Sequence, residues 1–430
     1  MSLTDDRPIG HDLATVDRVR WPDVATLPPG GIRARVARAL FTRQVARLPF
    51  RVSLPDGRNI GGGASGTPHM RLIRPGAFYR RLGHSGLIGF GEAYLAGDWT
   101  ADDLPAVLTV FCQRMSTLIP PPLQRLRDIA VHRHPNAERG TEANTQRNIS
   151  RHYDLSNDLF TLFLDETLTY SAALFGPGDG SIEVAAAAQP SDLADAQRHK
   201  IDRLLDAAGV RAGSRVLEIG TGWGELALRA GARGATVRSI TLSEEQRSLA
   251  LARIAAAGLS DRVRVELCDY RAVQGTYDAV VSVEMIEAVG FEFWPAYFST
   301  LHRVLTPGGR VGLQAITMPH DRMLASRDTY TWIHKYVFPG GLIPSETSVE
   351  DSATAAGLRV IGKHGFGLHY AETLRLWRDT FEARAAEVEA LGFDETFRRM
   401  WTFYLSYSEA GFRSRYLDVV QFVLAKGEGA

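Results

Sequence analysis

The residues with the clearest chemical pattern lie in one turn. The stretch VLEIGTGWGELAL, residues 216–228, joins a predicted strand to a predicted helix through Gly220, Gly222 and Gly224. Glycines at such a turn let a ligand approach the backbone, and the first turn of the helix offers free amides. The pattern departs from the dinucleotide fingerprint G-x-G-x-x-G, because Glu225 stands where its last glycine would be. The turn therefore predicts a binding site for another kind of ligand.

Two further strand ends indicate which ligand this is. Glu218 lies two residues before the first glycine, a second strand ends at SITLSEEQ, and a third ends at LCDYR with Asp269. A carboxylate at the third position can accept a hydrogen bond from an adenine amino group, as in class I methyltransferases. Together the strand ends favour S-adenosylmethionine, with Glu218 in the site rather than a solvated acid at a strand end. For Gln246 two interpretations stay open, a ligand contact or a surface residue at a helix start.

A sheet of parallel strands is needed to bring these side chains together. In the second half of the chain, strands alternate with helices, and the strands are SRVLEIG, TVRSITL, VRVELCD, YDAVVSV and GGRVGLQAI. This alternation predicts an α/β fold, the doubly wound sheet typical of class I S-adenosylmethionine-dependent methyltransferases. Upstream, LPFRVSLPDGRNIGGG predicts strands around an Asp-Gly turn, and the polar run over 120–150 predicts a linker. We therefore expect a smaller N-terminal α+β domain with its linker over residues 1–140, and a methyltransferase domain over residues 141–430.

The composition narrows the class of protein. With 430 residues, of which 45% are hydrophobic, the chain is long enough for more than one core. No run of about 18 apolar residues occurs, and the start MSLTDDRPIG lacks the basic and apolar regions of a secretion signal. Cys112 and Cys268 are too few for a disulfide framework or a cysteine metal site. The sequence thus predicts a cytoplasmic protein with no membrane span and no bound metal.

Charge is balanced overall but uneven along the chain. Residues 1–150 carry 20 Arg and no Lys against 13 Asp plus Glu, and residues 32–52 hold six of these arginines and no acid. This pattern is typical of a basic amphipathic helix on an anionic membrane surface. The alternative is a helix that packs on its own domain and leaves its arginines in solvent. Nucleic acid is not expected as a partner, because the chain has no recognisable binding module and no aromatic residues interleaved with these arginines.

The region from Arg147 onward resembles a known family of lipid-modifying enzymes. The motifs that carry the resemblance are HYDLSNDLFTLFLDETLTYSAALF, VLEIGTGWG, TLSEEQ, DYR, SVEMIEAVG, KYVFPGG and HYAETLRLW. They are similar to those of the cyclopropane-fatty-acyl-phospholipid synthase and mycolic-acid methyltransferase family. Upstream, GLIGFGEAYLAGDW resembles the N-terminal domain of the branch that acts on phospholipids. The resemblance implies methyl transfer from S-adenosylmethionine to the double bond of an unsaturated phospholipid acyl chain, through a carbocation.

The resemblance also assigns residues to the cofactor. The positions that match the family's cofactor contacts, together with Glu218 from the strand-end argument, are Tyr170, Ser171, Glu218, Gly220, Gly222, Thr241, Leu242, Gln246, Asp269, Tyr270 and Arg271. Trp223 has two open interpretations, packing near the cofactor or belonging to the core as an aromatic residue at a helix start.

For the chemistry, the family holds a bicarbonate ion as the base beside the cation. The matching positions of its shell are His152, Glu287, Ile316 and Tyr370. The departures, where the family has a cysteine and two histidines, are Ala172, Ala288 and Gln314. Bicarbonate therefore stays open as a second cofactor, and Gln314 joins the catalytic candidates. A carboxylate just past a strand end can stabilise a cation, orient a base or remove a proton itself, so Glu287 is expected to take part in the reaction rather than to cap a helix.

The product follows from how the cation loses its proton. The forms EMIEAVG and LQAIT, joined to this N-terminal domain, resemble the branch that makes 10-methylene chains from oleoyl phospholipid on the way to tuberculostearic acid. Ring closure of the same cation to a cyclopropane is the alternative product, and spacing and composition do not decide between the two. A methylene product implies a flavin- or NADPH-dependent reductase as a partner.

Two other functions stay open, a methyltransferase for a small molecule and a non-catalytic lipid-binding protein. Because the double bond lies deep in a bilayer, the resemblance implies peripheral docking of the protein on anionic lipids at the inner face of the cell membrane. Self-association into a homo-oligomer is consistent with the family.

Overall fold

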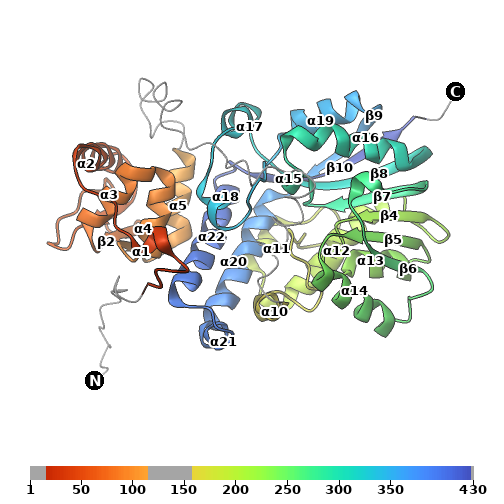
Figure 1. Ribbon diagram of the computed structural model, residues 1–430, viewed down its shortest axis with the longest axis horizontal. Coiled ribbons are helices and arrows are strands. Elements are labelled where there is room, and N and C mark those ends of the chain that lie inside the picture. Colours follow the sequence, from red (N-terminus) through yellow and green to blue (C-terminus); the bar gives the residue numbers. More distant parts are fainter. Residues whose placement is uncertain (1–15, 115–156, 428–430) are drawn as a thin grey trace. The chain divides into compact units, whose positions relative to one another are not determined.

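The computed structural model describes residues 16–114 and 157–427, and the chain gathers into two compact units (Figure 1). The first unit comprises Met1–Arg127 and Val388–Ala410, and the second comprises Asp128–Glu387 and Gly411–Ala430. The expected linker and the expected boundary at residue 140 lie outside the described residues. That boundary assigns Val388–Ala410 to the methyltransferase domain, whereas the structure groups this segment with the first unit.

The first unit combines helices with a small mixed sheet, which confirms the predicted α+β class. Its helices within residues 16–114 are α1 (Pro22–Ala25), α2 (Ile32–Val45), α3 (Pro75–Ser85), α4 (Leu87–Leu95) and α5 (Leu104–Gln113). Its strands are β1 (Arg51–Ser53), β2 (His69–Leu72) and β3 (Trp99–Ala101), with β1 parallel and β3 antiparallel to the central β2. The fully buried Arg81 ties the unit together, because its guanidinium pairs with Asp98 at 3.0 Å and donates to the carbonyl of Asp23 at 2.8 Å.

Near its C-terminus the chain returns to this unit. The helices there are α21 (Ala385–Ala390) and α22 (Glu395–Arg413). Arg399 donates to the carbonyl of Tyr94 at 2.9 Å, and the ring of Phe403 lies 5.4 Å from the ring of Tyr94. These contacts explain in physical terms why part of α22 belongs with α4.

The second unit is built on a seven-stranded sheet in the order β6-β5-β4-β7-β8-β10-β9 (Figure 1). The strands are β4 (Arg215–Ile219), β5 (Thr236–Thr241), β6 (Val263–Leu267), β7 (Tyr277–Val283), β8 (Leu305–Thr317), β9 (Leu358–Gly365) and β10 (Asp418–Lys426). Strands β4 to β8 are parallel to one another, while β10 is antiparallel to both β8 and β9. The five predicted strands and the doubly wound α/β fold are confirmed. Because β4 lies centrally and is followed along the sheet by β5 on one side and β7 on the other, the topology reverses at its carboxyl end.

Helices cover both faces of this sheet. The helices of the second unit up to residue 383 are α10 (Asn157–Phe163), α11 (Ile182–Ala187), α12 (Leu193–Ala207), α13 (Glu225–Ala232), α14 (Glu244–Ala256), α15 (Ile286–Val289), α16 (Trp294–Val304), α17 (His320–Ser326), α18 (Trp332–Tyr336), α19 (Glu346–Ala355) and α20 (Gly367–Ala383), with short 3₁₀ turns η3 (Pro190–Asp192), η4 (Tyr270–Ala272) and η5 (Phe291–Phe293). Successive residues of a strand point to opposite faces, so Val216 packs in a cluster with α12, α13 and α14, and Leu217 in another with α16 and α19. Across the described ranges, no helix is both long and apolar enough to cross a membrane.

Candidate active site

The glycine turn follows β4, and the structure shows why glycine suits each of its three positions. Gly220, Gly222 and Gly224 all have positive φ, which disfavours other residues. A Cβ at Gly220 would lie 2.5 Å from Cγ of Met285, and one at Gly224 would lie 3.0 Å from Cβ of Ala250, so both positions need glycine for close packing. A Cβ at Gly222 would meet no protein atom within 4 Å. The backbone there borders open space, which fits a ligand that lies against the turn.

Glu218 is a buried acid with a defined partner. It is 2% exposed, which excludes the interpretation as a solvated strand-end residue. The hydroxyl of Ser239 in β5 donates to its carboxylate, and that hydroxyl also lies 2.6 Å from the hydroxyl of Thr221. Burial raises the pKa of Glu218 to about 8, and the hydrogen bond from Ser239 opposes this rise only in part. The acid therefore links the end of β4, the start of the glycine turn and β5.

The end of β5 and the start of α14 hold two more expected residues together. The hydroxyl of Thr241 donates to the side-chain oxygen of Gln246 at 2.9 Å, and Ser243 caps α14 by accepting the backbone N–H of Gln246 at 3.2 Å. Gln246 is 6% exposed, so it is not an ordinary surface residue. Leu242 lies between them and is partly buried.

Beyond β6, the expected acid is held by a neighbouring arginine. The carboxylate of Asp269 accepts the backbone N–H of Arg271 at 2.9 Å and its guanidinium at 2.6 and 2.8 Å. Burial alone would raise the pKa of Asp269, but the bonds from Arg271 outweigh it and leave that pKa below its ordinary value. Tyr270 is buried, and burial raises the pKa of its hydroxyl to about 12. Asp269 is thus an ionised acceptor at the carboxyl end of β6.

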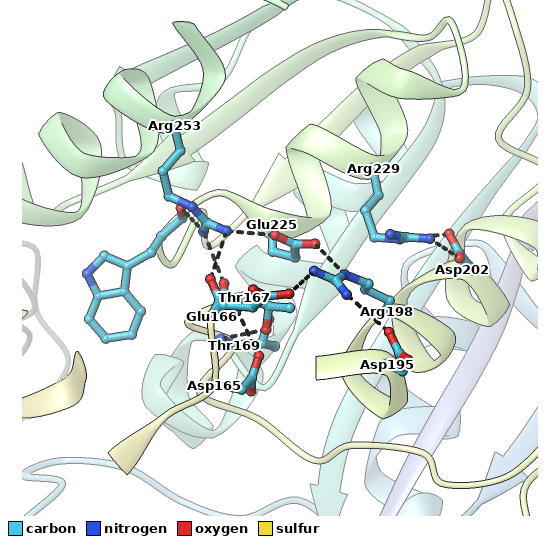
Figure 2. A network of polar contacts seen from close by, with 11 residues as sticks. Asp165, Glu166, Thr167, Thr169, Asp195, Arg198, Asp202, Glu225, Arg229 and Arg253 are labelled. Carbon is cyan, nitrogen blue, oxygen red and sulfur yellow. Dashed lines mark hydrogen bonds and ion pairs between the residues drawn. The ribbon is translucent and has the colours of Figure 1, made fainter. Parts of the chain in front are cut away.

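A network of polar contacts ties the segment before Tyr170 to the glycine turn (Figure 2). Arg253 of α14 donates to the carbonyls of Thr167 at 3.0 Å and Trp223 at 2.7 Å, and it pairs with Glu225 at 2.7 Å. Beside it, Arg198 of α12 contacts Glu166, Asp195 and Glu225 (Figure 2). Arg198 and Arg253 therefore hold both the segment before Tyr170 and the glycine turn, the two parts of the chain expected to contact the cofactor.

Tyr170 and Ser171 directly follow this segment and pack in the interior of the second unit. The ring of Tyr170 stacks on Trp377 at 5.2 Å, and the hydroxyl of Ser171 accepts from the ammonium group of Lys200 at 2.7 Å. Trp223 is 4% exposed, its indole N–H donates to Asn157 at 2.8 Å, and its ring lies 5.0 Å from that of Phe160. Trp223 therefore belongs to the core, and its contact with the cofactor stays a prediction.

The expected catalytic residues cluster at the carboxyl ends of β7 and β8. Glu287 accepts the backbone N–H of Ile316 at 2.5 Å, and its second carboxylate oxygen is buried with no hydrogen-bond partner among the described residues. Burial, and then the charge of Glu284, raise the pKa of Glu287 to about 8. Tyr370 reaches the same place from α20. His152 lies outside the described residues.

One residue of the cluster, Glu284, was absent from the expected set. It follows β7 directly, and its carboxylate accepts the hydroxyl of Tyr370 at 2.8 Å and the side-chain amide of Gln314 at 2.8 Å. The backbone N–H of Ala172 donates to the same carboxylate at 3.0 Å. The signal that could have revealed it is an acid directly after an apolar strand, three residues before a second acid, in SVEMIE.

A comparison with known families matches residues 141–422 to the model described as mycolic acid cyclopropane synthetase. The chain belongs to this family. Among its relatives, tuberculostearic acid methyltransferase UfaA1 of Mycobacterium tuberculosis is 52% identical over 96% of this chain and 97% of the relative. Cyclopropane-fatty-acyl-phospholipid synthase of Escherichia coli is 32% identical, over 81% of this chain and 86% of the relative.

A solved structure supports the same family. The crystal structure of mycolic acid cyclopropane synthase CmaA1 complexed with SAH and CTAB superposes with a TM-score of 0.58 at 33% identity, covering 65% of this chain and 98% of that one. As a member of this family the chain is an S-adenosylmethionine-dependent methyltransferase, as its sequence predicts. The open backbone at Gly222 and the acceptor Asp269 fit that cofactor.

Proposed function

We propose that this enzyme methylates the double bond of an oleoyl-type chain in a membrane phospholipid and converts it to a 10-methylene acyl chain. The observation that carries the proposal is the pair of carboxylates, Glu284 and Glu287, at the strand ends beside the cofactor turn. An alkene is a weak nucleophile, so its methylation builds positive charge on carbon that must be stabilised and then discharged by loss of a proton. The identity to a tuberculostearic acid methyltransferase over almost the whole chain, first unit included, supports this substrate and product.

In the proposed mechanism the protein stabilises charge and excludes water. The turn at Gly222 and the ends of β5 and β6 would hold S-adenosylmethionine, which would supply the methyl group. The carboxylate cluster borders apolar groups, because Ala172 is fully buried and the ring of Tyr370 packs on Phe412 at 4.6 Å. In such surroundings a fixed negative charge stabilises a nearby cation more strongly than it would in water. After a hydride shift along the acyl chain, loss of a proton from the added methyl group leaves the methylene, which a flavin- or NADPH-dependent reductase would convert to a methyl branch.

Access to the lipid is proposed to depend on α2 of the first unit. This helix buries Phe41 and Val45 against its own unit, as the packing alternative predicts, but it also leaves Ile32 at 72% and Val36 at 50% exposed. The arginines along and just after α2 are exposed as well, and they are Arg33, Arg35, Arg38, Arg43 and Arg47. An apolar edge within a basic surface fits peripheral docking on anionic headgroups at the inner face of the membrane.

The proposed docking is tested by vesicle binding. Binding to phosphatidylglycerol vesicles should weaken as salt is raised, because salt screens the attraction between arginines and headgroups. Binding that is indifferent to salt would remove the electrostatic part of the proposal.

The substrate proposal is tested by incubating the enzyme with S-adenosylmethionine and dioleoyl-phosphatidylglycerol vesicles and analysing the released fatty acids by mass spectrometry with fragmentation. A gain of one CH₂ with a terminal-alkene signature supports the proposal. A ring would assign the cyclopropane product instead. No gain in mass, with cofactor binding intact, would overturn the substrate and favour a small-molecule methyltransferase or a non-catalytic lipid-binding protein.

A further inference from the structure

Glu284 has a backbone conformation that its residue type disfavours. Its φ is 50°, in the left-handed region, which residues other than glycine rarely adopt. The position follows β7, whose last residue, Val283, is paired with Gln314 of β8. The next residue, Met285, packs against Gly220 of the cofactor turn. The unfavourable conformation therefore places a carboxylate beside the cofactor turn, at the edge where the reaction must occur.

The surroundings of Glu284 act on its charge in opposite directions. Burial raises the pKa of Glu284 above its ordinary value, while the charge of Lys200 and the donors at Ala172, Tyr370 and Gln314 limit that rise. The amide of Gln314 is itself oriented, because Gln421 donates to its oxygen at 3.1 Å and so leaves the nitrogen facing Glu284. A carboxylate with three donors holds its negative charge better than one with a single donor.

Glu287 differs from Glu284 in each of these respects. Among the described residues, Ile316 is the one other residue that donates a hydrogen bond to the carboxylate of Glu287, which also has a buried oxygen without a partner there and the charge of Glu284 nearby. Two close carboxylates in such unequal surroundings share one proton unequally. This difference in hydrogen-bond donors favours the proton on Glu287 and the charge on Glu284.

The same donors leave no place for a second small anion. The family resemblance implies a bicarbonate ion in a shell that includes positions 172, 287, 314, 316 and 370 of this chain. Here the donors at Ala172, Gln314 and Tyr370 are directed to Glu284, and the backbone N–H of Ile316 is directed to Glu287. A bicarbonate ion among them would meet the charge of Glu284 without donors of its own, so the residues present do not fit it.

We infer that the Glu284 carboxylate is the built-in base of the reaction and takes the part of a bound bicarbonate ion. The inference rests on the proposed function. In the proton-loss step, a C–H bond of the added methyl group breaks and its proton moves to a carboxylate oxygen of Glu284. The electron pair of that bond forms the new C=C bond of the methylene, or the closing C–C bond of a ring, and the positive charge of the acyl chain is discharged.

The test compares the full-length enzyme with two variants, E284Q and E284G, in buffer freed of bicarbonate and in buffer supplemented with it. The wild-type rate of methyl transfer should be the same in both buffers. E284Q should lose about 100-fold or more in both, as expected for loss of a base. E284G should be inactive without bicarbonate and gain at least tenfold on addition of bicarbonate or formate, because the vacated site keeps its three donors. The left-handed backbone suits glycine, so this variant should fold.

Two controls separate this inference from the proposed function. Affinity for S-adenosylmethionine should stay within about threefold of wild type in both variants, and E292Q, at an exposed glutamate of η5, should keep full activity. Binding of ¹³C-labelled bicarbonate, followed by NMR without any lipid, should be seen for E284G and not for wild type. A wild-type enzyme that binds bicarbonate or needs it for activity, or an E284Q variant that keeps its rate, would overturn the inference. If the wild type methylates no oleoyl phospholipid, the proposed function is overturned instead. The NMR measurement then still shows whether Glu284 excludes bicarbonate from the site.

Discussion

Replacement of Gly222 by alanine should weaken cofactor binding while changing the stability of the fold only slightly. Its φ is 52°, and a Cβ built there meets no protein atom within 4 Å. Gly258, after the end of α14, is the matched control, because its φ is 67° and its Cβ also meets nothing within 4 Å. Both substitutions carry the same backbone penalty of roughly 1–2 kcal/mol, offset in part by the smaller entropy of the unfolded chain. Each should therefore lower the melting temperature by a similar small amount, about 2–4 °C.

Cofactor binding should distinguish the two variants. The methyl group of G222A enters the open space beside the turn, where the ligand approaches the backbone, whereas that of G258A faces solvent. We expect the Kd for S-adenosylmethionine to rise at least tenfold in G222A, which is about 1.4 kcal/mol, and to stay unchanged in G258A. Isothermal titration calorimetry and thermal unfolding measure the two quantities independently. Equal Kd values for both variants would refute the assignment of this space to the cofactor.

Three further expectations concern the supports of the site. R253M should raise the Kd for S-adenosylmethionine about fivefold or more in calorimetry, since it removes the bonds to both cofactor segments, while R247M on the same helix should not. Burial raises the pKa of Glu218 from 4.5 to about 8, so between these pH values the folded chain keeps a proton that the unfolded chain releases. The free energy of unfolding should therefore fall as the pH rises from about 4.5 to about 8. In urea titrations E218Q should lose less stability over this pH range than the wild type. Q421L removes the hydrogen bond that orients the side-chain amide of Gln314. Steady-state kinetics should show a reduced kcat, by up to about tenfold, while the affinity for the cofactor stays unchanged.

The parallel part of the sheet was predictable because it depends on local patterns. Strands β4 to β8 are short apolar runs separated by helical periodicity, and that alternation is visible in the sequence. The antiparallel strands β9 and β10 were not predicted, since they are adjacent to each other and to β8 only through contacts between distant parts of the chain. The same reason applies to Val388–Ala410, whose place in the first unit depends on contacts with residues about 300 positions earlier, such as that between Arg399 and Tyr94.

The candidate site was predictable where a residue type at a strand end suffices. Gly222 and Asp269 are of this kind. Glu218 and Gln246 each had two interpretations, and only burial, which is a property of the folded chain, decides between them. Glu284 was missed because the motif draws attention to Glu287, and its role depends on which donors surround the carboxylate rather than on spacing.

Methyl transfer followed by loss of a proton from the same methyl group is the central claim, and isotope retention tests it most directly. The enzyme is incubated with S-adenosylmethionine carrying a fully deuterated methyl group and with dioleoyl-phosphatidylglycerol vesicles, and the modified acyl chains are analysed by mass spectrometry. The account predicts two deuterons in each modified chain, because one of the three leaves as the proton taken by the carboxylate. Chains that retain all three deuterons, or that carry none, would contradict it.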